Sequence, residues 1–140
     1  MKSARILLTV GALLLLATAA FHGAGGAMVS GWLDGDRGRI LRLLWFVPPI
    51  DWGIVALIWG YATWRPDARL APVVWLAAII PSAVALMLVG AVGAGFPGIW
   101  MLLGAVLLAA YGGFRMRTAD GATPVQPQVG PATATITPLK

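Results

Sequence analysis

The stretch that decides the fold is Ile40–Ala62, ILRLLWFVPPIDWGIVALIWGYA, which is 23 residues long and almost entirely apolar. A helix rises about 1.5 Å per residue, so a helix of this length crosses the hydrocarbon core of a bilayer, which is about 30 Å thick. The length therefore predicts a membrane-spanning helix and not a helix buried in a water-soluble core.

Three further apolar blocks surround this stretch, at Ile6–Met28, Leu70–Val89 and Pro97–Phe114. Over the whole chain 59% of the residues are hydrophobic and 11% are charged, whereas soluble domains carry about 25% charged residues. A membrane barrel would show blocks of about ten residues with alternating polarity. We therefore expect an all-α integral membrane protein, in which residues 1–117 form a four-transmembrane-helix antiparallel bundle with short links.

The composition changes after Arg117 to TADGATPVQPQVGPATATITPLK. This segment is rich in Pro, Thr and Ala and has no apolar periodicity, so residues 118–140 are predicted to be a disordered cytoplasmic tail.

The distribution of Lys and Arg predicts the orientation. If the N terminus is cytoplasmic, seven basic residues lie on the cytoplasmic side and three on the other: Lys2, Arg5, Arg65, Arg69, Arg115, Arg117 and Lys140 against Arg37, Arg39 and Arg42. For a bacterial-type inner membrane, which is the expected location, this asymmetry favours both termini in the cytoplasm. Met1–Ala20 also resembles a secretory signal peptide, whose cleavage would leave three helices. The apolar run continues to Met28, which favours an uncleaved first helix.

Two prolines interrupt the second block, and a carboxylate follows them. Pro48-Pro49 predicts a break in the second helix, because proline lacks an N–H and clashes with the preceding turn; Pro81 lies inside the third block. If the helix restarts near Pro49, Asp51 falls in its first turn, where unpaired N–H groups and the helix dipole favour an acid. Asp51 then has two interpretations, a structural cap or a proton- or ligand-handling group near the middle of the membrane.

His22 is the second candidate for proton or ligand handling. It lies in the outer part of the first helix, and a direct contact with Asp51 requires helix tilt, a shifted span or a bridging water. A lone buried histidine more often forms a hydrogen bond with a carbonyl or a neighbouring side chain, so this interpretation stays beside the functional one.

Tryptophans recur every seven residues at Trp45, Trp52 and Trp59, which places them on one face of a straight helix. Such a stripe packs against a partner, flanks an apolar ligand or faces lipid. Small residues recur every four positions at Ala105, Ala109 and Gly113, which predicts a close contact between helix backbones.

The inventory of reactive side chains is short: the chain has no cysteine, no glutamate and one histidine. It contains no nucleophile–base pair, no glycine-rich phosphate loop and no metal-ligand cluster, so we expect no cofactor, no metal site and, on balance, no enzyme. The net charge of +5 does not indicate nucleic-acid binding, because the basic residues flank the apolar blocks.

The expected function is therefore an accessory, assembly or interaction subunit of a membrane complex. Its expected partners are the lipid bilayer and either a second copy of the chain or a larger complex. The alternative is a small oligomeric proton-coupled carrier or channel that uses Asp51 with His22.

Overall fold

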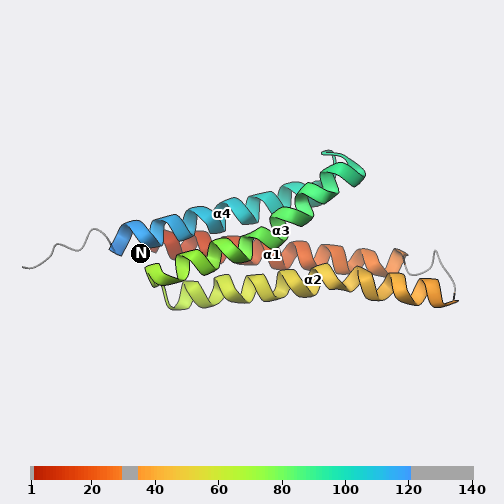
Figure 1. Cartoon of the computed structure of the whole chain (residues 1–140), viewed down its shortest axis with the longest axis horizontal. Helices are drawn as coiled ribbons and strands as arrows, with labels where there is room; N and C mark the ends of the chain where they lie inside the picture. The colour runs from red at the N-terminus through yellow and green to blue at the C-terminus, as the bar shows by residue number, and fades with distance from the viewer. Residues whose placement is uncertain (1, 30–34, 121–140) are drawn as a thin grey trace, which may run out of the picture.

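A computed structural model of the chain describes residues 2–29 and 35–120. Its four α-helices are α1 (Lys2–Val29), α2 (Gly35–Trp64), α3 (Ala71–Val92) and α4 (Pro97–Asp120), and a short 3-10 turn, η1 (Ala68–Leu70), precedes α3. Successive helices run in opposite directions (Figure 1). The predicted all-helical fold is confirmed for the described residues. By length and composition, all four helices are long and apolar enough to cross a membrane.

Helix α2 is continuous through Pro48 and Pro49, so the predicted break is wrong. The two prolines remove only the N–H groups that would bond the carbonyls of Leu44 and Trp45. Inside a bilayer no water is present to bond an unwound backbone, so the helical path keeps all the remaining bonds satisfied. Helix α3 likewise continues through Pro81, which is buried.

The fourth helix is longer than predicted, since it continues past Arg117 to Asp120. Residues 118–120 therefore belong to α4 and not to a tail. The rest of the predicted disordered segment, residues 121–140, lies outside the described residues.

Helix α1 is the centre of the bundle, because it packs extensively against both α2 and α4, while α3 packs mainly on α4. Glycines allow α1 and α4 to approach closely. A Cβ atom added to Gly11 would lie 3.1 Å from the Ala105 carbonyl oxygen, and one added to Gly112 would lie 2.9 Å from Leu8 Cγ. Ala105 and Ala109 are buried, so the predicted small-residue face of α4 does form a close helix contact.

Trp75 joins α3 to α4 beside the third member of that small-residue face. Its Nε1–H donates a hydrogen bond of 3.0 Å to the Ala110 carbonyl oxygen. A Cβ atom on Gly113 would lie only 2.7 Å from this nitrogen. The indole therefore fits only because residue 113 has no side chain.

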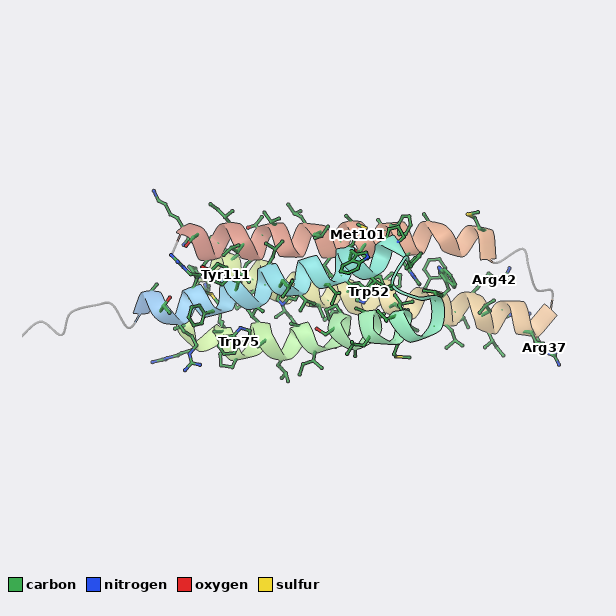
Figure 2. The ribbon with its side chains drawn as sticks, turned by 90° about the horizontal axis from the view of Figure 1, so that it is seen from above. Arg37, Arg42, Trp52, Trp75, Met101 and Tyr111 are labelled. Atoms are coloured by element: carbon green, nitrogen blue, oxygen red, sulfur yellow. The ribbon has the colours of Figure 1, made fainter. Side chains whose placement is uncertain are left out.

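The two ends of the bundle differ in charge and in shape. The end with the N terminus, here called the terminal end, carries exposed basic residues from all four helices or their links: Arg5, Arg65, Arg69, Arg115 and Arg117. The far end holds the α3–α4 turn and the projecting ends of α1 and α2. Figure 2 shows Arg37 and Arg42 on the part of α2 that extends past α3 and α4.

Candidate functional site

Asp51 lies on the flank of α2, next to Trp52 of the buried face, and is half-buried. It is nine residues from Arg42 and fourteen from Arg65, which places it about 13 Å and about 21 Å from these charges along the helix. The carboxylate is thus inside the apolar span of α2, more than two helical turns from either arginine.

The interior position of Asp51 excludes the predicted capping role. Because α2 is continuous, its backbone N–H groups at this level already bond carbonyls of the preceding turn. Within residues 2–29 and 35–120, the carboxylate takes part in no hydrogen bond and no ion pair; the bonded acids there are Asp36 and Asp67. Asp51 is therefore an acid inside an apolar helix with no partner among the described residues.

His22 belongs to an aromatic cluster with Trp45 and Trp52, here called the His22 cluster. The imidazole stacks on the Trp45 ring at 4.6 Å between centroids and 13° between planes. It meets the edge of Trp52 at 5.4 Å and 72°. Trp45 Nε1–H also donates a 2.8 Å hydrogen bond to the backbone carbonyl of His22. This cluster ties the outer part of α1 to α2.

The backbone of α1 lies close to Trp45 because residues 25 and 26 are both glycines. A Cβ atom on Gly26 would lie 2.8 Å from Trp45 Cδ1, and one on Gly25 would lie 3.4 Å from its Cζ2. The Gly25-Gly26 pair thus makes the space in which the Trp45 indole lies against α1. A side chain at residue 26 would displace this ring and with it the stacking on His22.

The structure does not bring His22 and Asp51 together. The described contacts of the imidazole are with the indoles of Trp45 and Trp52, whereas Asp51 points from the flank of α2. A proton relay between the two groups thus has no direct geometric support within this chain.

Trp52 combines deep burial with an unpaired polar atom. Only 1% of its surface is exposed, and its Nε1–H has no hydrogen-bond acceptor among the described residues. A small cavity of about 10 Å³ adjoins it, about the space that one water molecule needs; it is lined by Thr18, Phe21, His22, Trp52, Leu88, Phe96, Gly98 and Leu102. The unpaired Trp52 N–H and the His22 side chain both adjoin this cavity.

Trp59 completes the tryptophan stripe and is fully buried, at 0% exposure. Its Nε1–H donates a 3.2 Å hydrogen bond to the Val74 carbonyl oxygen of α3. The three tryptophans therefore share one face of α2, as their spacing predicts, and that face is turned toward α1 and α3. Figure 2 shows Trp52 between the helices.

The described residues offer little that could hold a metal or run a reaction. No three side chains of His, Cys, Asp or Glu gather into a metal-binding group within residues 2–29 and 35–120. The hydroxyls of Thr18, Thr63 and Ser82 bond carbonyls four residues earlier in their own helices. These hydroxyls act as ordinary intrahelical donors, and no histidine or carboxylate activates them.

Sequence reasoning missed a groove between α1 and α2 at the terminal end, lined by residues of both helices such as Ala12, Leu16, Gly60 and Trp64. The spacing of Ala56 and Gly60, four residues apart, is the signal that could have indicated it. That signal was weak, because Ala and Gly recur at this spacing in most of the helices.

Comparisons of the chain with protein-family models, with curated proteins and with solved structures give no match.

Proposed function

We propose that this protein is a non-catalytic subunit of a larger membrane assembly, and that it recognises its partner within the bilayer through the Asp51 flank of α2. The observation that carries the proposal is the unpartnered carboxylate of Asp51. Its neighbours on the exposed side, Ile50 and Ile54, are large apolar residues with 61% and 53% of their surface exposed. The acid is therefore at the border between the bundle and its surroundings.

The cost of that position supports a partner. An ionised aspartate in the centre of a spanning helix costs about 2.5–3.5 kcal/mol on insertion scales, and such groups normally pair inside a bundle or line a water-filled space. Within the described chain Asp51 does neither. A cation or hydrogen-bond donor from another membrane protein, or from a second copy of this chain, would remove the cost and select the partner.

The proposed setting is a bacterial-type inner membrane with both termini in the cytoplasm. The support is the cluster of five arginines at the terminal end, whereas the far end carries three, one of them, Arg39, paired with Asp36 at 3.6 Å. Cytoplasmic segments carry the excess of Lys and Arg in such membranes.

The test compares wild type with Asp51→Leu and Asp51→Asn, each expressed in its native host and purified in native-lipid nanodiscs. We expect the wild type to purify in an assembly of fixed stoichiometry, measured by mass photometry. Asp51→Leu should raise the dissociation constant for the partner at least about tenfold, because a charge-assisted contact of about 1.5–3 kcal/mol is lost. Asp51→Asn, which keeps hydrogen-bonding capacity, should lose less.

The control variant is Ile54→Leu, one turn further along the same exposed side of α2, which should leave the assembly intact. Circular dichroism reports whether each variant keeps its helix content. A wild-type chain that is monomeric in native lipid at all concentrations would overturn the proposal.

The alternative function is a small proton-coupled carrier, and the same carboxylate favours it, since acids inside membranes often relay protons. The bundle interior is filled by Trp52, Trp59, Leu102 and other buried side chains, so a pathway would lie between protomers. Asp51→Asn in proteoliposomes should abolish proton-coupled flux while the protein stays folded. If the wild type carries no flux, this alternative fails.

A further inference from the structure

The groove between α1 and α2 opens on the outside of the bundle and has a volume of about 500 Å³. Its floor consists of small residues, Ala12 on α1 with Ala56 and Gly60 on α2. A Cβ atom on Gly60 would meet no atom within 4 Å, so the floor is open at that point. Leu13, Leu57 and Trp64 form walls that project toward the lipid, with 60%, 74% and 73% of their surfaces exposed.

The groove extends over half of the membrane. Its lining residues run from Thr9 to Leu16 on α1 and from Ala56 to Trp64 on α2, which is about 10–12 Å along each helix. One leaflet contributes about half of a hydrocarbon core of about 30 Å. The groove thus begins at the terminal end, where the arginines are, and ends near the middle of the bilayer.

The mouth of the groove is cationic. The Arg65 guanidinium lies 5.3 Å from the centre of the Trp64 ring, which is itself a wall of the groove. Arg5 is exposed and precedes Thr9 by one helical turn on α1, so it shares the groove face. Neither arginine has an ion pair within residues 2–29 and 35–120. The nearby acid in the sequence, Asp67, uses its carboxylate to accept the Arg69 N–H at 2.8 Å.

We propose that this groove binds an anionic phospholipid of the leaflet at the terminal end, with one acyl chain along Ala12, Ala56 and Gly60 and the phosphate between Arg5 and Arg65. An acyl chain is apolar like the lining of the groove, and the groove is about as long as one leaflet of the bilayer is thick. Arginines beside the ends of spanning helices attract anionic headgroups, and each arginine adds to the attraction. A second copy of a helix fits less well, because the bulky walls at Leu57, Tyr61 and Trp64 stand where a helix backbone would have to approach.

The experiment is native mass spectrometry of the full chain after delipidation and incubation with phosphatidylglycerol or phosphatidylcholine of identical acyl chains. We expect the wild type to retain one phosphatidylglycerol with at least about tenfold preference over phosphatidylcholine, as two arginine contacts imply. The double variant Arg5→Gln/Arg65→Gln should lose this preference. Gly60→Leu should occupy the floor and lose retention of both lipids.

The matched control is Gly90→Leu on α3, where a Cβ atom also meets nothing within 4 Å and the same gain in helix propensity applies. It should retain phosphatidylglycerol like the wild type. Size-exclusion chromatography and circular dichroism report folding and oligomeric state for all variants.

A second readout needs no variant: phosphatidylglycerol with a photoreactive acyl chain should label the wild-type chain within residues 9–16 and 56–64. Labelling spread evenly over all four helices would overturn the proposal, and so would unchanged retention in Gly60→Leu. A wild-type dimer that Gly60→Leu converts to a monomer without loss of lipid would assign the groove to a second copy and also overturn it. Loss of assembly in Asp51→Leu with lipid retention intact would leave this inference standing, since the two sites are separate.

Discussion

The buried indoles of Trp52 and Trp59 differ in the hydrogen bonding of their ring nitrogens. Trp52 and Trp59 are both buried in α2, but Trp59 Nε1–H bonds the Val74 carbonyl oxygen while Trp52 Nε1–H has no acceptor among the described residues. Side chains of the same type on the same helix face therefore allow the value of one hydrogen bond to be isolated.

Trp59→Phe and Trp52→Phe provide that measurement. Both substitutions remove a similar apolar volume, but only Trp59→Phe removes a hydrogen bond. We expect Trp59→Phe to lower the free energy of unfolding by about 1 kcal/mol more than Trp52→Phe does. Reversible unfolding in mixed detergent–SDS micelles, followed by circular dichroism, gives both values. Equal losses would mean that Trp52 Nε1–H also has an acceptor in the membrane.

The direction in which residues face was the part of the site that the sequence could not indicate. The spacing of Trp45, Trp52 and Trp59 correctly predicts a shared face. In a bilayer, however, lipid is as apolar as the protein interior, so hydrophobicity does not distinguish the inner face of a helix from the outer one. The same limit applies to Asp51, whose place on the flank of α2 depends on a helix rotation that no pattern marks.

At the scale of the helix, the sequence predicted correctly that four helices form, but it predicted wrongly that the second of them is broken. The four apolar blocks predicted four helices because block length is set by the bilayer. The break at Pro48-Pro49 was expected because proline lacks an N–H and clashes with the preceding turn. Helix α2 instead remains helical there, because an apolar surround penalises an unwound backbone more than two missing N–H groups.

Pro48→Ala/Pro49→Ala tests this account of α2. The variant restores donors for the carbonyls of Leu44 and Trp45 without changing the path of the helix, so it should raise the free energy of unfolding by about 1 kcal/mol or more. Amide hydrogen exchange around these residues should also slow.

Pro72→Ala is the matched control for that experiment. Pro72 lies in the first turn of α3, where a backbone N–H has no acceptor within the helix, so the substitution should change stability little. A double variant in α2 that unfolds, or that gains no more than Pro72→Ala, would show that the prolines maintain a shape that α2 needs.

For the molecule as a whole, the alternating helix directions place both ends of the described chain at the same end of the bundle (Figure 1), so four membrane-spanning helices would put them on one side of a membrane. The absence of cysteine from the sequence makes this easy to measure, because each introduced cysteine is unique. Ser3, Thr118 and Gly95 are all exposed, the first two at the terminal end and the third in the α3–α4 turn.

Ser3→Cys and Thr118→Cys should therefore react with a membrane-impermeant maleimide from the same side, and Gly95→Cys from the opposite side. Inverted and right-side-out vesicles each expose one side of the membrane to the maleimide. If the proposed orientation is correct, the first pair reacts in inverted vesicles. Labelling of Ser3 and Thr118 from opposite sides would contradict the fold itself.

Because the helices differ in length, α1 and α2 extend beyond the α3–α4 turn at the far end of the bundle. Phe21 of α1 contacts Phe96 of the α3–α4 turn at 6.5 Å, and α1 continues eight residues beyond Phe21, to Val29, or about 12 Å further. A bilayer with its headgroup layers is about 40–45 Å thick, which matches the length of α1, 28 residues or about 42 Å. The ends of α1 and α2 therefore extend past the α3–α4 turn without exceeding that thickness, and Arg37 and Arg39 are exposed on this extension.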